Sequence, residues 1–179
     1  MSAGRRLLRE PPNRVLGREV NRAVGPHDWS TDAADSILKQ KPGVVWSISP
    51  ERSVFDAIHE MSDKRVGALL VMSEGSLVGI VSERDYARKV ILLGRSSKNT
   101  EVREIMTTDV VCVTPSHRLD ECMALMTKHH IRHLPVIKDG QVVGIVSIGD
   151  VVKWIISAQE ETIRHLEQYI SGIPTDLMN

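Results

Sequence analysis

The chain repeats itself once, at an offset of 65 residues, and this doubling constrains its fold more than any other feature of the sequence. The two copies align without gaps between residues 45–90 and residues 110–155. Seven of the eleven positions from 75 to 85 are identical to their partners, against twelve identities across the whole 46-residue window. Because the identity is concentrated in one short stretch, we expect two copies of one fold, each with one local site.

Each copy predicts the same order of elements. A short β-prone run, at 44–48 or 110–113, is closed by Ser-Pro or Thr-Pro and followed by a helix. The apolar positions that define these two helices are Val54, Ala57, Ile58 and Met61 in the first copy, and Leu119, Cys122, Met123 and Met126 in the second.

A hairpin and a second helix complete each copy. The turns Glu74-Gly75 and Asp139-Gly140 are typical of tight β-hairpins and separate strand-like runs rich in aliphatic residues. The strands are expected at 66–72 and 78–81 in the first copy and at 131–137 and 143–146 in the second, with helices at 84–93 and 149–156.

A β-α-β-β-α unit of about 60 residues is too small to bury a good core alone. We therefore predict an α/β protein in which two such domains pack sheet to sheet with pseudo-twofold symmetry. The expected divisions are an N-terminal arm at 1–32, a first domain at 33–95, a second domain at 100–157 and a C-terminal helix and tail at 158–179.

The motif shared by the two copies resembles that of the CBS domain, named after cystathionine β-synthase. It reads Gly79-Ile-Val-Ser-Glu-Arg-Asp85 in the first copy and Gly144-Ile-Val-Ser-Ile-Gly-Asp150 in the second. Residues 104–107 and 131–136 carry further marks of that family. The resemblance covers 33–157, and the paired arrangement is similar to a Bateman module in a stand-alone CBS-pair protein.

The resemblance implies a regulatory, non-catalytic function. Members of the family bind AMP, ADP, ATP, NAD or S-adenosylmethionine in clefts between the two domains, and AMP is our first choice here. Ligand occupancy would shift the relation of the domains to each other and to a regulated partner protein, by no more than its differential affinity for the two states. The rival hypothesis is a structural or adaptor protein that dimerises and whose clefts are vestigial.

The residues of the motif themselves allow two interpretations. Ser82 with Asp85, and Ser147 with Asp150, have the spacing of a helix capping box. Such boxes favour Glu or Gln at the third position because the longer side chain reaches back, yet both copies have Asp. The resemblance implies that each carboxylate accepts from the two hydroxyls of a ribose, a pair of charge-assisted hydrogen bonds.

By the family's pairing, the two clefts differ in charge. The cleft at Asp85 would collect positively charged and polar groups, namely Arg84, Thr107, Arg132 and His133. The cleft at Asp150 would instead collect Lys39, Gly67 and Ala68. The charge suited to phosphate therefore falls beside Asp85, although Arg132 and His133 could also be an ordinary exposed strand edge.

Composition excludes several other functions. Lys plus Arg and Asp plus Glu both total 23, so the chain lacks the net positive charge that draws proteins to nucleic acids. No P-loop, GxSxG or HExxH motif is present, so we expect no enzyme. We do not expect His129, His130 and His133 to form a metal site. Residues 131–136 are predicted to be a strand with Pro135 inside it, so the three histidines cannot lie on one face of a helix.

The two cysteines and the two ends of the chain add weaker signals. Cys112 and Cys122 fit no redox or zinc motif and are expected to be buried, reduced thiols. This favours a cytoplasmic protein. No run of 18 apolar residues predicts a membrane span.

The N-terminal arm is rich in arginine between apolar residues. It is interpreted as a surface arm or docking helix; a mitochondrial transit peptide, and hence the matrix, is the alternative, although Glu10 and Glu19 argue against it. Nucleic-acid binding through the arm is a third hypothesis. The arginines are Arg5, Arg6, Arg9, Arg14, Arg18 and Arg22.

The tail predicts a helix with an apolar stripe that ends at Gly172. The stripe could pack on its own domain or on a second subunit of a homodimer. Its members are Val152, Ile155, Ile156, Gln159, Ile163, Leu166 and Ile170.

Overall fold

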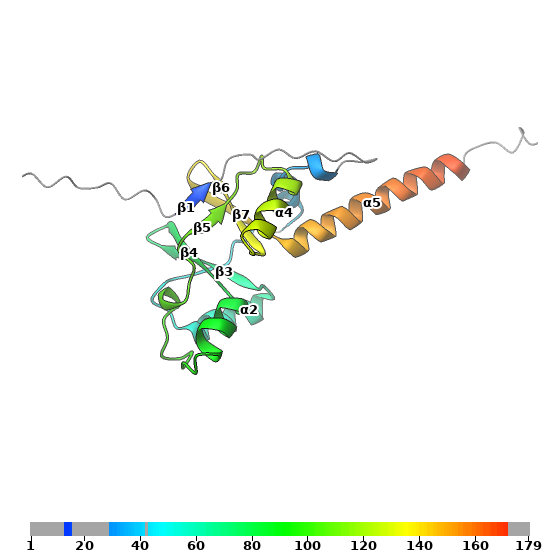
Figure 1. The fold of residues 1–179 in the computed structure, drawn as a ribbon. Helices are drawn as coiled ribbons and strands as arrows, with labels where there is room; N and C mark the ends of the chain where they lie inside the picture. Colours follow the sequence, from blue (N-terminus) through cyan, green and yellow to red (C-terminus); the bar gives the residue numbers. More distant parts are fainter. Residues whose placement is uncertain (1–12, 16–28, 42, 172–179) are drawn as a thin grey trace, which may run out of the picture. The chain divides into compact units, whose positions relative to one another are not determined.

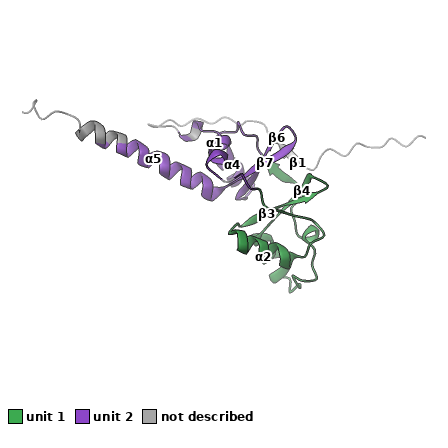
Figure 2. Cartoon of the chain, turned by 180° about the vertical axis from the view of Figure 1, so that it is seen from behind, with its two compact units in different colours: residues 1–16, 45–112 green, residues 17–44, 113–179 purple. Residues whose placement is uncertain are grey.

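The computed structural model describes residues 13–15, 29–41 and 43–171 (Figure 1). The chain divides into two compact units (Figure 2). Unit 1 comprises Met1–Leu16 and Val45–Cys112, and unit 2 comprises Gly17–Val44 and Val113–Asn179. Of the predicted N-terminal arm at 1–32, only residues 13–15 and 29–32 are described.

Unit 1 is built on a three-stranded sheet in the order β2-β3-β4. Strands β2 and β3 are parallel, β3 and β4 form an antiparallel hairpin, and β1 pairs in parallel with β5 in a separate ladder. The elements are β1 (Asn13–Val15), β2 (Ser47–Ile48), α2 (Val54–Lys64), β3 (Ala68–Ser73), β4 (Ser76–Ser82), α3 (Glu83–Tyr86), a π-helical turn η2 (Ala87–Ile91), a 3₁₀ turn η3 (Val102–Glu104) and β5 (Val110–Cys112).

Unit 2 repeats this plan around the antiparallel hairpin of β6 and β7. In unit 2, a parallel bridge between Val113 and Val136 corresponds to the pairing of β2 with β3 in unit 1. The elements are η1 (Trp29–Thr31), α1 (Ala34–Gln40), α4 (Leu119–Lys128), β6 (His133–Lys138), β7 (Gln141–Ser147) and α5 (Ile148–Ser171). The predicted α/β class and the β-α-β-β-α order of both copies are confirmed.

The two hairpin turns have the backbone that their residues favour. Glu74 and Gly75 have φ of 50° and 76°, and Asp139 and Gly140 have φ of 50° and 79°. Two successive positive φ angles give the turn whose twist matches the flanking strands, and glycine adopts the second one without strain. The tight turns expected from the sequence are therefore confirmed.

The core of each unit is aliphatic. In unit 1 the helical positions Val54, Ala57 and Met61 are fully buried, as the spacing predicts, and pack with strand residues such as Leu69 and Val81. In unit 2 the corresponding core is formed by Val113, Leu119, Cys122, Met126, Leu134, Val136, Val146 and Val151.

Cys112 and Cys122 are buried and unpaired, as expected. Burial raises the pKa of the Cys112 thiol to about 11, and burial together with the nearby carboxylates of Glu121 and Asp120 raises that of Cys122 to about 12. Both groups are therefore neutral thiols at physiological pH and function as small apolar side chains in the core.

The helix expected at 84–93 has an irregular course. It begins as α3 and widens at Ala87 into the π-helical turn η2, whereas the equivalent stretch of unit 2 continues as the regular helix α5. A π-helical turn accommodates one additional residue, and such turns occur frequently at functional sites. The equivalence of the two copies therefore ends within this helix.

The two units do not coincide with the two sequence copies. Helix α1, which the sequence places in the first domain, packs in unit 2: Ala34 and Ile37 are buried, and the N–H groups of Ala34 and Asp35 donate to His117 O and Pro115 O at 2.8 and 3.0 Å. The indole of Trp154 donates to Asp32 Oδ2 at 2.7 Å. Unit 2 is consequently discontinuous in sequence.

The opening segment of the second copy belongs, conversely, to unit 1. The N–H of Val102 donates to Arg52 O at 2.9 Å, and Thr107 and Ile80 exchange both of their backbone hydrogen bonds at 2.9 and 3.0 Å. The division at 95–100 therefore differs from the spatial one. A repeat in the sequence identifies which segments are equivalent. It does not show on which of the two copies the apolar face of each segment packs.

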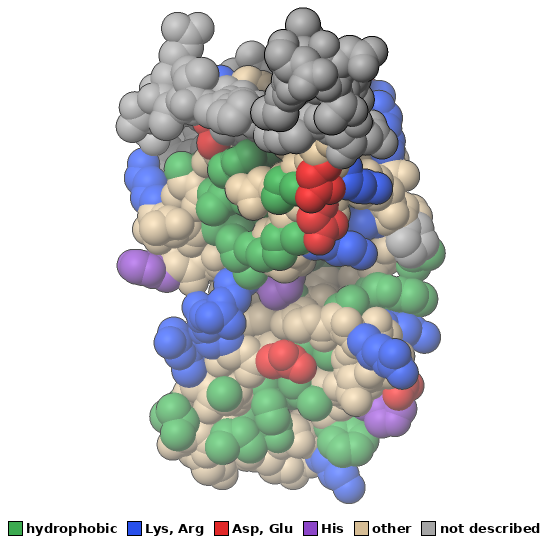
Figure 3. Space-filling model, turned by 90° about the vertical axis from the view of Figure 1, so that its right-hand side faces the viewer, with side chains coloured by type: hydrophobic (Ala, Val, Ile, Leu, Met, Phe, Trp, Pro, Cys, Tyr) green, Lys and Arg blue, Asp and Glu red, His purple; other side chains and the backbone are tan. Residues whose placement is uncertain are grey.

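Helix α5 carries the predicted C-terminal stripe. Val152, Ile156 and Ile163 are exposed, while Val151 and Ala158 on another face of the helix are buried. The side chains of Leu166 and Ile170 lie outside the described ones. On the face shown in Figure 3, hydrophobic side chains reach the surface among charged ones. Within the described part of the chain, none of the helices combines the length and apolar character needed to cross a membrane.

Candidate functional site

A serine and an aspartate meet at the same strand-to-helix junction in both units. In unit 1, Asp85 Oδ2 accepts from the Ser82 N–H at 3.1 Å and from Ser82 Oγ at 2.6 Å, while the Asp85 N–H donates to Ser82 Oγ at 3.3 Å. In unit 2, the same three bonds between Ser147 and Asp150 measure 2.7, 2.7 and 3.2 Å.

Both pairs therefore form complete capping interactions with an aspartate. The expectation that the shorter side chain disfavours capping is wrong here, because the serine hydroxyl and amide both lie within reach of one carboxylate oxygen. The residue type at this position consequently does not indicate a ligand by itself. The remaining indications come from the surroundings of the two carboxylates.

Asp85 is held by a lysine of its own helical segment. Lys89 Nζ lies 2.8 Å from Asp85 Oδ1 and also donates to Ile105 O at 2.5 Å. The lysine therefore connects the π-helical turn, the carboxylate and the opening segment of the second copy, all within unit 1. With Ser82 on Oδ2 and Lys89 on Oδ1, both oxygens of Asp85 are engaged, and the side chain is 17% exposed.

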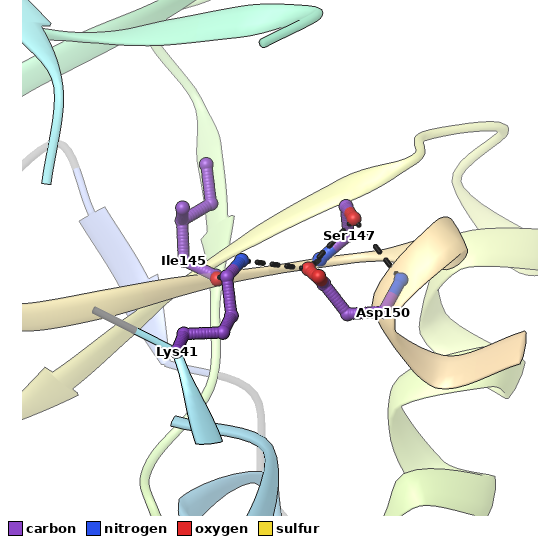
Figure 4. A network of polar contacts seen from close by, with 4 residues as sticks. All are labelled: Lys41, Ile145, Ser147 and Asp150. Carbon is purple, nitrogen blue, oxygen red and sulfur yellow. Dashed lines mark hydrogen bonds and ion pairs between the residues drawn. The ribbon is translucent and has the colours of Figure 1, made fainter. Parts of the chain in front are cut away.

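Asp150 is held by a lysine from a distant part of the sequence (Figure 4). Lys41 follows α1 directly, and its Nζ lies 2.8 Å from Asp150 Oδ2 and donates to Ile145 O at 3.1 Å. The Asp150 side chain is 22% exposed. The bonds from Lys41 and Ser147 to this carboxylate all end on Oδ2.

Two opposing effects act on the acidity of Asp150. Burial raises its pKa, but the hydrogen bonds from Lys41 and Ser147 and the charge of Lys41 outweigh burial and hold the pKa below the ordinary value. The group is therefore a carboxylate at physiological pH. As a result it can accept, but not donate, hydrogen bonds.

The strand residues expected in the clefts lie opposite the serine of their own unit. Ala68 is the register partner of Ser82, and His133 is the register partner of Ser147. Gly67 O accepts from the Glu83 N–H at 3.2 Å, and Arg132 O accepts from the Ile148 N–H at 2.9 Å. The grouping of Arg132 and His133 with Asp85 stays a prediction, because these residues belong to different units.

Three other predicted residues have clear positions. Arg84 lies beside Asp85 in α3. Thr107 pairs with Ile80 in unit 1. Lys39 contacts Asp35 at 2.7 Å, one helical turn away, and its side chain is 75% exposed. Of the two lysines that flank Gln40, the structure thus brings Lys41, and not Lys39, to Asp150.

Lys41 and Lys89 are the residues that sequence reasoning missed. The sequence predicts that the positive charge suited to phosphate lies beside Asp85, but Lys41 gives Asp150 a cation as well. One signal was available: Pro42 stands at the position equivalent to Thr107, and a proline has no N–H to donate. No three His, Cys, Asp or Glu side chains of the described residues are grouped so that they could hold a metal ion.

Comparison with known proteins identifies the class. The CBS domain family model matches residues 41–91 and 102–157. The chain is 46% identical to the mitochondrial CBS domain-containing protein CBSX3 of Arabidopsis thaliana over 147 residues, which cover 79% of this chain and 71% of that protein. It is 36% identical to the CBS domain-containing protein YhcV of Bacillus subtilis over 106 residues, 59% of this chain and 75% of that one.

Solved structures give the same result. A protein with CBS domains from Burkholderia ambifaria, described as having a signal-transduction role, superposes with a TM-score of 0.69 at 51% identity, covering 70% of this chain and 94% of that one. The CBS-domain protein ATU1752 of Agrobacterium tumefaciens gives 0.65 at 34% identity, covering 68% and 97%. The chain therefore belongs to the CBS domain family, with two CBS domains in tandem.

Proposed function

We propose that the protein is a non-catalytic regulatory module that binds an adenosine-containing nucleotide and transmits its occupancy to a partner protein. The observation that carries the proposal is the pair of partly exposed carboxyl groups, Asp85 and Asp150, each held by a serine and a lysine at equivalent strand-to-helix junctions of the two units. AMP is the first choice, and ADP, ATP, NAD and S-adenosylmethionine are the alternatives.

The chemistry of the carboxylates supports a ribose as the recognised group. The two oxygens of a carboxylate can accept from the adjacent hydroxyls of a cis-diol, and hydrogen bonds to a charged acceptor are shorter and stronger than neutral ones. The capping serine fixes the side-chain rotamer, so that little conformational freedom is lost on binding. Lys41 and Lys89 provide cations near the same positions for an anionic ligand.

Substituting the carboxylates separates ribose binding from helix capping. We expect Asp85→Ala and Asp150→Ala each to weaken AMP binding at their own site by about 2 kcal/mol, because a hydrogen bond to a charged group contributes roughly 1.5–3 kcal/mol. Asp→Glu is the matched control: glutamate closes a capping box but moves the carboxylate by one methylene. Asp→Glu should preserve the unfolding temperature and still weaken the binding of AMP.

Isothermal calorimetry and thermal denaturation of the same samples measure both effects. An unchanged dissociation constant in the folded alanine variants would leave capping as the only role of these residues.

A structural or adaptor function is the second candidate, and the exposed stripe of α5 favours it. Val152, Ile156, Gln159 and Ile163 follow one another at spacings of four and three residues, the pattern of a coiled-coil seam. We propose that this seam is covered by a second copy of the chain. Nucleotide-dependent thermal stabilisation discriminates the two functions, since only a sensor shows it.

The homodimer leads to a direct prediction. The protein should sediment as a dimer at micromolar concentration, and Ile163→Glu should shift it to a monomer because it places a charge in the seam. Arg164→Glu is the control. It also introduces a glutamate, but at the next position along the helix, which lies outside the seam and where Arg164 is exposed. Analytical ultracentrifugation that shows a monomeric wild type, or equal dissociation of both variants, contradicts an α5-mediated dimer.

The cytoplasm is the proposed compartment, and the mitochondrial matrix is the alternative; the name of the Arabidopsis relative describes that protein as mitochondrial. The neutral, buried thiols of Cys112 and Cys122 are compatible with either reducing environment. The net charge of zero supports a protein that does not use nucleic acid as its partner. Binding that decreased steeply with salt would instead support the arginine-rich arm as a nucleic-acid contact.

A further inference from the structure

Lys41 connects three parts of unit 2 that are far apart in the sequence. It is the C-cap residue that directly follows α1, and its N–H donates to Leu38 O at 3.2 Å. Its ammonium group bonds to the Ile145 carbonyl of β7 and to the Asp150 carboxylate at the start of α5 (Figure 4). A change at Asp150 is therefore transmitted to the end of α1 by one side chain.

The two units use different groups at this place. In unit 1, the Ile80 carbonyl accepts from the backbone N–H of Thr107 at 2.9 Å. The equivalent carbonyl in unit 2 is that of Ile145, and the residue equivalent to Thr107 is Pro42, which has no N–H. In unit 2 the donor to the Ile145 carbonyl is the Lys41 ammonium group, which also donates to Asp150.

The cation of unit 1 has a local origin instead. Lys89 lies four residues after Asp85 on the same helical segment, and its second bond, to Ile105 O, reaches the opening segment of the second copy and not the segment that precedes the first. The position equivalent to Lys89 is Trp154, which donates to Asp32 and cannot serve as a counter-ion. Only in unit 2, among the described residues, does the counter-ion of the motif aspartate come from the segment preceding the first copy.

We propose that Lys41 is a tethered counter-ion that a ribose displaces from Asp150, and that this displacement loosens the packing of α1 on the rest of unit 2. The proposal rests on the proposed function, since it assigns a ribose to Asp150. Oδ2 of Asp150 already accepts three bonds, two from Ser147 and one from Lys41. Because a diol needs both oxygens, one of these donors must leave.

Of the three donors, the Lys41 ammonium is the one that leaves most readily. The Ser147 N–H is part of the backbone, and the Ser147 hydroxyl is fixed by also accepting from the Asp150 N–H. Lysine has a flexible four-carbon stem and a strongly hydrated head group that returns to solvent readily. Ligand occupancy of Asp150 thereby reaches α1 and the N-terminal arm that precedes it.

Adenosine is the appropriate probe, because it has the diol but no phosphate that could hold Lys41 in place. Calorimetry in an Asp85→Ala background isolates the Asp150 site. Removing a competing counter-ion stabilises the bound state relative to the free one, so Lys41→Met should tighten adenosine binding by about tenfold. Lys39→Met, the same change two residues away on an exposed side chain, should leave it within about twofold.

Hydrogen exchange of peptides covering residues 34–41 tests the coupling in the otherwise wild-type chain. Saturating adenosine should speed exchange in α1 several-fold, Lys41→Met should produce a similar increase without ligand, and Asp150→Ala should abolish the response to adenosine. Adenosine binding that depends on Asp150 but leaves α1 exchange unchanged would overturn the coupling and leave the proposed function standing.

Two other outcomes are decisive. Weaker adenosine binding in Lys41→Met would mean that Lys41 contacts the ligand and does not compete with it, which overturns the counter-ion role. The absence of any Asp150-dependent binding of adenosine or AMP would overturn the ribose assignment at this site, and the displacement of Lys41 with it.

Discussion

Deleting residues 1–41 is expected to destabilise unit 2 by about 4 kcal/mol or more, while unit 1 keeps its hairpin and core. The deletion exposes the surface that Ala34 and Ile37 cover, and burying one Ile side chain alone contributes roughly 1.5–3 kcal/mol. It also removes the partners of Trp154 and Asp150. Since whole domains are stable by only about 5–15 kcal/mol, this loss is large.

Deletion of residues 1–31 is the matched control, because it removes the same arm and β1 but retains Asp32 and α1. Hydrogen exchange should show faster exchange in β6 and β7 for the longer deletion only, with β3 and β4 equally protected in both proteins. Loss of protection in β3 and β4 instead would mean that α1 supports unit 1, contrary to the contacts of Ala34 and Asp35.

The second large effect is expected for Gly79→Ala. A Cβ at Gly79 would lie 3.0 Å from the Thr107 carbonyl oxygen and 2.7 Å from Met106 Sδ. The methionine can move, but the backbone of Thr107 is fixed by its two hydrogen bonds to Ile80. Overpacking of this kind costs about 1–3 kcal/mol, and we expect about 2 kcal/mol for this variant in chemical denaturation.

Two glycines of unit 2 serve as references for this substitution. At Gly149 the nearest atom to an added Cβ is Ser147 Oγ at 3.7 Å, so Gly149→Ala should be neutral or stabilise α5 by up to about 1 kcal/mol. At Gly144 the obstructing atoms all belong to the Leu38 side chain, which can rotate, and an intermediate loss is expected. If Gly149→Ala lowered the free energy of unfolding as much as Gly79→Ala does, the cause would be a general requirement for glycine flexibility and not a steric clash.

The repeated pattern predicts most of the fold, because each copy contains its own local signals. Alternation and helical spacing identify the strands and helices, and Glu74-Gly75 and Asp139-Gly140 specify the hairpins. These signals act over a few residues, so they are legible without tertiary information. The packing of α1 in unit 2 cannot be predicted in this way, since the apolar face of α1 would fit either copy.

The motif serines and aspartates could be found from the sequence, but their counter-ions could not. Asp150 and Lys41 are 109 residues apart and meet only because α1 ends beside β7. Lys89 lies four residues from Asp85, a common helical spacing, but the π-helical turn between them changes the usual geometry. The side chain of Lys39 illustrates the difficulty: it lies on the same segment as Lys41 and turns to Asp35.

The discontinuity of unit 2 also determines the order in which the chain can fold during synthesis. Residues 45–112 of unit 1 are contiguous, so this region can form as soon as it has left the ribosome. Helix α1 is made earlier but has its partners at Pro115, His117 and Ile145, and a helix of seven residues is not stable alone in water. Helix α1 is therefore made before the residues on which it packs and is among the last elements to dock, after closure of a loop of about 80 residues or more.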